Sequence, residues 1–143
     1  MIIDTGDIGS VVSALYEMIS GPKGPRDYAQ RSEVFHEAAR MMRTGLGADG
    51  TPWVKIMTPE DHERDTAPIF AAEDFFEVEV AREIKQFGNI AQVWSLYEKR
   101  KTPDGAPYGR GINSVQLYKG EHGWRVTAMI WDNERAGLTI PGL

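Results

Sequence analysis

Residues 110–134, RGINSVQLYKGEHGWRVTAMIWDNE, read as two long strands joined by a short loop. Residues 110–118 and 124–133 are rich in β-branched and aromatic side chains, and the stretch between them contains two glycines. Runs of this kind on either side of a glycine-containing loop are typical of a β-hairpin. Neither face of the hairpin is wholly polar, so the pattern indicates a central pair of strands that is covered on both sides.

The register of this hairpin predicts a cavity. If the loop closes with Tyr118 opposite Trp124, counting along the strands places Gln116 opposite Val126, on the same face as Ser114. Polar side chains on a buried, mostly apolar face need hydrogen-bond partners. A hollow that admits a ligand would provide such partners, so we expect a polar-lined pocket on this face.

The composition is that of one globular domain, which we expect to span residues 1–143. Hydrophobic residues make up 41% of the chain and charged residues 26%, both ordinary fractions. The net charge of −5 and the lack of a basic stripe argue against a nucleic-acid partner. The absence of cysteine excludes disulfides and cysteine-ligated metals. No apolar run predicts a membrane span or a signal peptide, so we expect a cytoplasmic protein.

Upstream of residue 110, the chain predicts three helices and four more strands. Apolar residues at helical spacing predict a helix over 8–19, and residues 26–33 predict a second, short one. Residues 34–43 and 53–57 read as paired strands, and a Thr-Pro-Glu-Asp start at residue 58 predicts a third helix to about residue 71. Residues 75–100 form the second long hairpin. The fold class is therefore α+β, with the N-terminal helices on the concave side of a strongly curved, antiparallel or mixed sheet.

The Gly88-Asn89 pair predicts a two-residue turn in the second hairpin. Counting from that turn places Arg82 opposite Ser95, on a mostly apolar face that also holds Tyr97. The opposite face combines charged residues with two large apolar ones: Glu79, Glu83, Trp94 and Leu96. An outward face with exposed apolar area favours a homodimer.

Several segments give the chain a family resemblance. These are SGPKGPRD at the end of the first helix, VFHEAARM in the first strand, the TPED helix start, FGNIAQVWS and RGINSVQL. Over essentially its whole length the chain resembles the nuclear transport factor 2-like superfamily, the cystatin-like α+β cone, and within it the small bacterial SnoaL-like proteins. The resemblance implies a curved sheet wrapped around a helix, with a pocket at the wide end.

The same resemblance leaves the activity open, because this fold serves many functions. The superfamily includes ketosteroid isomerase, scytalone dehydratase, limonene epoxide hydrolase, polyketide cyclases and members that only bind or dimerise. Our first expectation is a protein that binds a small hydrophobic molecule. The alternative is a lyase, isomerase or cyclase acting on a hydrophobic oxygenated compound such as a polyketide or steroid, and a dimerisation module is a third reading.

The catalytic residues of these enzymes do not carry over as a set. Steroid isomerases of this fold use a tyrosine and two acids in an apolar pocket. Tyr16 lies on the corresponding helix, but Glu79 and Glu83 fall on the charged face in the predicted register. Scytalone dehydratase uses pocket histidines, whereas His62 looks like a helix-surface position. No catalytic residue is therefore assigned.

The candidate pocket residues each have a plain structural alternative. Tyr16 would donate a hydrogen bond to a ligand carbonyl, or pack in the core with its hydroxyl at the rim. Arg82 would anchor an anion or a carbonyl, or pair with an internal acid such as Asp132 or Glu134. His36 would act as a general base or stay structural. The full predicted set is Tyr16, Arg82, Ser95, Tyr97, Ser114 and Gln116.

The register is the weakest step of this prediction. A shift of one residue in either hairpin would exchange the faces and bring a different group inward: Glu79, Glu83, Trp94, Asn113 and Trp131. We expect no metal, because the three histidines are scattered and no acids cluster on one face. We expect no cofactor either.

Overall fold

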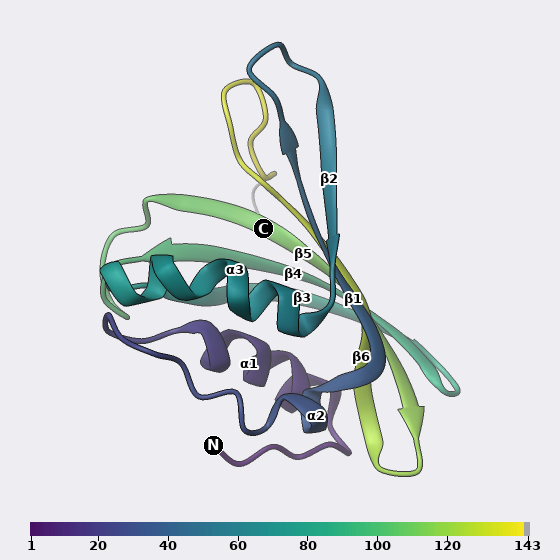
Figure 1. Cartoon of the computed structure of the whole chain (residues 1–143). Helices are drawn as coiled ribbons and strands as arrows, with labels where there is room; N and C mark the ends of the chain where they lie inside the picture. Colours follow the sequence, from purple (N-terminus) through teal and green to yellow (C-terminus); the bar gives the residue numbers. More distant parts are fainter. Residues whose placement is uncertain (142–143) are drawn as a thin grey trace.

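Six strands form one curved sheet in the computed structural model of the chain, which describes residues 1–141 (Figure 1). The strand order is β2-β1-β6-β5-β4-β3. Neighbouring strands are antiparallel except β1 and β6, which run parallel. The sheet is therefore mixed and the fold is α+β, as predicted. The elements are α1 (Ile8–Ile19), α2 (Arg31–Val34), β1 (Phe35–Leu46), β2 (Pro52–Met57), α3 (Pro59–Ala72), β3 (Phe76–Phe87), β4 (Ile90–Arg100), β5 (Gly109–Gly120) and β6 (Gly123–Asn133).

The two long helices begin where the sequence predicts. The Asp7 side chain caps α1 by accepting a hydrogen bond from the Ser10 amide at 3.0 Å. In α3, the Thr58 hydroxyl and the Asp61 carboxylate each accept from the other residue's backbone amide, which forms a capping box. Both caps satisfy amides that have no partner inside the helix.

The predicted helix over 26–33 is mostly absent: α2 covers only Arg31–Val34. The reason is Arg26, whose guanidinium donates to the backbone carbonyls of Ile19, Gly21, Pro22 and Gly24. These bonds hold residues 21–26 as a loop folded around one side chain. A helix that began at Pro25 would break this arrangement.

The predicted register of the last hairpin was wrong. Tyr118 pairs with Arg125, one residue beyond Trp124, because the turn is tighter than expected: only two residues, Glu121 and His122, separate the paired Gly120 and Gly123. A bulge next to Gln116 then shifts the pairing by one more residue, so that Gln116 pairs with Ala128.

Gly123 explains the tight turn. Its φ of 96° lies in the left-handed region, and a Cβ there would lie 2.3 Å from the Thr5 carbonyl oxygen. That carbonyl accepts from the Trp124 amide at 2.7 Å, which ties the N-terminal segment to the start of β6.

The core lies between the helices and one face of the sheet. Figure 1 shows α1, α2 and α3 on the same side of the sheet, with the other side uncovered. On the covered side, Val11 and Val12 of α1 are fully buried together with Val93, Val115 and Val126 of three central strands. Within residues 1–141, no helix is both long and apolar enough to cross a membrane.

Candidate functional site

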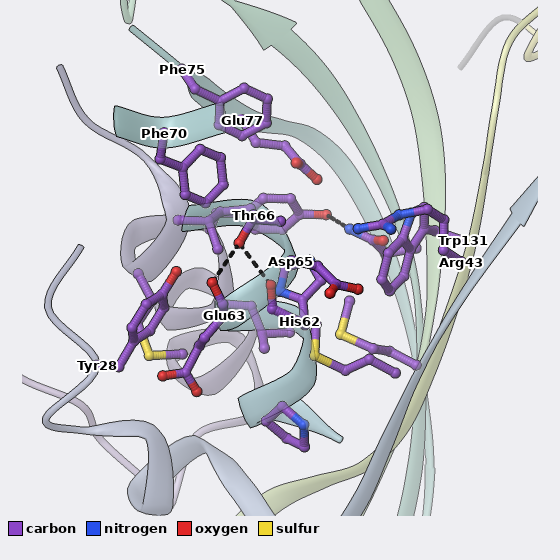
Figure 2. A pocket seen from close by; sticks show the side chains of 18 of the residues that line it. Tyr28, Arg43, His62, Glu63, Asp65, Thr66, Phe70, Phe75, Glu77 and Trp131 are labelled. Atoms are coloured by element: carbon purple, nitrogen blue, oxygen red, sulfur yellow. Dashed lines mark hydrogen bonds between the residues drawn. The ribbon is translucent and has the colours of Figure 1, made fainter. Parts of the chain in front are cut away.

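A cavity of about 270 Å³ lies between α1, α3 and the covered face of the sheet. Figure 2 shows Phe70 and Phe75 on one side of it and Trp131 on another. The phenyl rings of Phe70 and Phe75 are 5.1 Å apart between centroids, so this part of the wall is aromatic and well packed. The remaining apolar wall comes from α1, β1, α3 and β6: Leu15, Met18, Ile19, Phe35, Met41, Pro59, Ile69 and Met129.

Of the predicted pocket residues, Tyr16 and Tyr97 line this cavity. Their rings lie 6.5 Å apart, and the Tyr97 hydroxyl donates to the Asn133 side chain at 2.6 Å. Ser95 is fully buried next to Tyr16, behind the cavity wall.

Ser114 and Gln116 lie on the uncovered face of the sheet, not in the cavity. Both even-numbered positions of β5 point away from the helices, while Asn113 and Val115 between them are buried. The two shifts in the hairpin add up to two residues, so Ser114 and Gln116 still share a face with Ala128 and Ile130, but that face is the uncovered one. The prediction therefore chose the wrong face of the hairpin as the covered one, and the alternative face assignment gave Asn113 and Trp131, which do line the cavity.

A bulge in β3 brings two acids to the covered face. Arg82 pairs with Ser95 as predicted, but Glu79 pairs with Tyr97, which leaves Val80 as the extra residue between two registers. Beyond Val80 the side chains exchange faces. Glu79, which was predicted on the charged outer face, therefore points inward, and so does Glu77. Nothing in the alternating sequence of residues 76–84 marks the position of this bulge.

Glu79 belongs to a chain of hydrogen bonds that runs from Arg82 to Asn113. Ser95 donates to one Glu79 carboxylate oxygen, and Arg82 donates to the other from Nε at 2.9 Å. Because the Ser95 proton is used in this way, the Tyr16 hydroxyl is the donor in its 2.5 Å bond to Ser95 Oγ. Asn113 completes the chain by donating to the Tyr16 oxygen at 3.0 Å. Arg82 is thus the internal ion-pair partner of an acid, the alternative that the sequence left open, but with Glu79.

Glu77 differs from Glu79, because no ion pair joins its carboxylate to another side chain within residues 1–141. Its side chain reaches into the cavity below Phe75 (Figure 2). Burial raises the pKa of Glu77 to about 7, while the Lys99 charge and the Asn113 amide lower that pKa by smaller amounts. A carboxyl group that titrates near neutral pH inside an apolar cavity is able to accept or donate a proton.

His62 is also part of the cavity wall, although the sequence placed it on the helix surface. It is buried, and its ring lies edge-on to Trp131 with centroids 5.7 Å apart. Burial, and secondarily the charge of Arg43, lowers the pKa of His62 to about 4. At neutral pH this imidazole is uncharged and adds to the apolar wall.

His36 lies outside the cavity, on β1. Its Nδ1 accepts from the Ala38 amide at 3.0 Å, and its ring packs edge-on against Tyr118. These contacts give it a local structural role. Within residues 1–141, no group of three or more His, Asp or Glu side chains is placed to hold a metal ion.

The chain was compared with known proteins. Neither a protein-family model nor a curated protein matches it. Solved structures do match at the level of the fold. An NTF-2-like protein of unknown function from Silicibacter pomeroyi has 16% sequence identity and a TM-score of 0.60, and the match covers 89% of this chain and 92% of that one.

Two further matches agree with this. A protein of unknown function with a cystatin-like fold, from Nostoc punctiforme, has a TM-score of 0.66 at 12% identity, over 94% of this chain and 96% of that one. A proposed ketosteroid isomerase from Shewanella frigidimarina has a TM-score of 0.60 at 13% identity, over 92% of this chain and all (100%) of that one. The chain therefore has the nuclear transport factor 2-like, cystatin-like fold, as the sequence predicted.

Proposed function

We propose that the protein binds a small, mostly apolar molecule with an oxygen function in the cavity between α1, α3 and the sheet. The observation that supports this most directly is the cavity lining, where aromatic and aliphatic walls surround a few residues with polar groups, among them Glu77, Tyr16 and Asn113. Ligand sites commonly combine an apolar wall with a few polar groups that orient the ligand. A ketosteroid, named for one structure of similar fold, is a molecule of this chemical kind.

The binding proposal is tested with 4-phenylbutan-2-one, which has an apolar body and one carbonyl group. Titration followed by amide NMR should shift signals around Phe70, Asn113 and Trp131. The variant Ile69→Trp, at a half-exposed residue of the cavity wall, should bind at least about tenfold more weakly because the larger ring occupies the cavity.

Ile84→Trp is the matched control, because Ile84 is exposed to a similar degree but lies on β3 away from the cavity. Its affinity should equal that of the unmodified protein. Signals that move only on the uncovered face, or equal affinities for all three proteins, would contradict the proposal.

A second candidate function is proton transfer at a carbon next to a carbonyl, as in an isomerase or lyase. The observation that favours it is the position of Glu77, a carboxyl group with a pKa of about 7 that faces the same cavity space as Tyr16 and Asn113. The Glu77 carboxylate would take a proton from the carbon, and the electron pair would move to the carbonyl oxygen as an enolate. Returning the proton to another carbon completes an isomerisation.

The same ketone tests this candidate. In deuterated water the protein should speed the exchange of the hydrogens next to the carbonyl, with a rate that rises as the pH passes through about 7. Glu77→Gln should lose this acceleration by about a hundredfold or more, yet retain binding. Exchange that is equally fast with Glu77→Gln would leave binding as the function and exclude Glu77 as the base.

We also propose that the protein forms a homodimer through the uncovered face of the sheet. One lateral row of paired residues runs across five strands and exposes three large apolar side chains, Ile56, Ile130 and Trp94, the last at 49% exposure. Leu96, predicted to share this surface, is buried within the chain at 6% exposure. Sedimentation of the Trp94→Glu variant as a monomer, where the unmodified protein is a dimer, would support this interface; a monomeric unmodified protein would refute it.

A further inference from the structure

The charged side chains in the cavity wall are not all neutralised. Arg31 donates to Glu63 at 2.7 Å, and Asp65 accepts from Lys55 of β2 at 2.5 Å. Within each of these two pairs the positive and the negative charge cancel. Three charged residues of the wall remain outside these pairs: Glu77, Lys99 and Arg43. The Lys99 charge acts on Glu77, which leaves Arg43.

The Arg43 guanidinium has neither an ion pair nor a hydrogen bond to any side chain or backbone group within residues 1–141. It lies on the covered face of β1, where Lys55 and Trp131 are its neighbours on the adjacent strands. Its guanidinium lies 5.8 Å from the centre of the Trp131 ring, and the two side chains lie together at one side of the cavity (Figure 2). The indole ring positions the guanidinium without using any of its N–H donors.

An arginine in this position is suited to bind an anion. A guanidinium offers five donors in a flat fork that matches the two oxygens of a carboxylate. The charge of Arg43 acts on Asp65, but Asp65 already accepts from Lys55, so the local balance of Arg43, Lys55 and Asp65 is positive. A half-buried cation with free donors favours a ligand that brings its own negative charge.

We propose that the natural ligand of the cavity is an apolar monocarboxylate, whose carboxylate binds Arg43 while its hydrocarbon body fills the aromatic part of the cavity. This inference rests on the proposed function, because it names the class of the ligand for the same site. The apolar body would lie against Phe70 and Phe75, on the side of the cavity that Glu77 shares.

Two matched probes test this inference: 4-phenylbutanoate and 4-phenylbutan-1-ol, which differ only in the carboxylate. At pH 6 the acid is ionised while Glu77, with a pKa of about 7, is mostly protonated and does not repel it. The unmodified protein should bind the acid at least about tenfold more tightly than the alcohol, as expected of a charge-assisted bidentate contact. The Trp131 indole signal should also respond more strongly to the acid.

Variants of two arginines on β1 test whether Arg43 causes the preference for the acid over the alcohol. Arg43→Met should bind acid and alcohol equally, because the preference for the acid is lost with the guanidinium. Arg43→Lys, which preserves the charge and is the safer variant for folding, should keep part of the preference. Arg40→Met is the matched control, because Arg40 is exposed on the opposite face of β1 and should leave the preference intact.

The outcomes separate this inference from the proposed function. Equal binding of the two probes by the unmodified protein, or a preference that survives in Arg43→Met, would overturn the carboxylate inference and leave the binding function standing. Binding of neither 4-phenylbutan-2-one nor these two probes would overturn both.

Discussion

Glu77 and Glu79 are the same amino acid, two positions apart on one strand and one face, yet they lie in two different kinds of surroundings. Around Glu79 every polar group has a partner: Ser95 and Arg82 donate to it, and Tyr16 donates to Ser95. Around Glu77 the neighbouring space is the cavity, and burial raises the pKa of this residue to about 7. The difference teaches that a carboxylate held in an ion pair serves the structure, whereas one that faces a cavity without an ion pair has its pKa raised by burial.

The largest expected effect comes from placing leucine at each of the two positions. Glu79→Leu should lower the free energy of unfolding by about 2–3 kcal/mol, because Ser95 and the partly buried Arg82 lose their acceptor. Glu77→Leu at pH 8 should leave the stability unchanged or raise it, because it removes a buried charge whose cost of burial exceeds what Lys99 and Asn113 return. Urea unfolding followed by tryptophan fluorescence measures both.

Glu83→Leu is the control for these two variants, because Glu83 is exposed on the same strand and should change the stability by no more than about 0.5 kcal/mol. Equal losses for Glu77→Leu and Glu79→Leu would show that both acids are structural and would end the distinction.

The second prediction concerns the pH dependence of stability. The folded-state pKa of Glu77 lies above its ordinary value of 4.5, at about 7, so the contribution of Glu77 is fully present below pH 4.5 and is lost as the pH rises to about 7. Each pKa unit corresponds to about 1.4 kcal/mol. Allowing for the solvent access that Glu77 retains, Glu77→Gln should be about 2 kcal/mol more stable than the unmodified protein at pH 8 and similar to it at pH 4.5.

His62 changes the stability in the opposite sense. Its pKa is lowered from 6.5 to about 4, so stability is lost as the pH falls from 6.5 through 4. The two contributions partly cancel between pH 4.5 and 6.5 in the unmodified protein. In Glu77→Gln only the His62 contribution remains, and stability should rise with pH over this interval. A stability difference between the two proteins that does not vary with pH would contradict the raised pKa of Glu77.

The smallest expected effect separates the Glu79 chain from the cavity. Ser95→Ala should lower the free energy of unfolding by about 1 kcal/mol, because Tyr16 and Glu79 both lose a hydrogen-bond partner. Ser114→Ala and Gln116→Leu, on the uncovered face, should change neither the stability by more than about 0.5 kcal/mol nor the affinity for a ligand. A ligand affinity that falls in either variant would restore these residues to the site.

Much of the fold could be predicted from local sequence. Residues close together in the sequence predict the capped starts of α1 and α3, the Gly88 turn and the two long hairpins. The structure confirms all of these. The helix predicted over residues 26–33 is mostly absent, because the Arg26 side chain donates to backbone carbonyls outside that segment. The pairing of Arg82 with Ser95 was also predicted correctly, since no bulge lies between that pair and the turn.

The site was harder to predict, because its composition depends on two bulges. Of the predicted pocket residues, only Tyr16 and Tyr97 line the cavity. Asn113 and Trp131 line it as the alternative register predicted, whereas Glu77 and Arg43 line it without having been predicted. Each bulge moves every later side chain to the other face, so an error of one residue exchanges the lining completely.

The sequence by itself determined the elements, the α+β class and the resemblance to the nuclear transport factor 2-like fold. These depend on periodicity, caps and turns, which act over a few residues. Only the tertiary structure decided which face of each strand meets the helices, because the extra residues at Val80 and beside Gln116 are accommodated by packing between strands distant in sequence. For the same reason only the tertiary structure decided that Glu79 would be paired and Glu77 left facing the cavity.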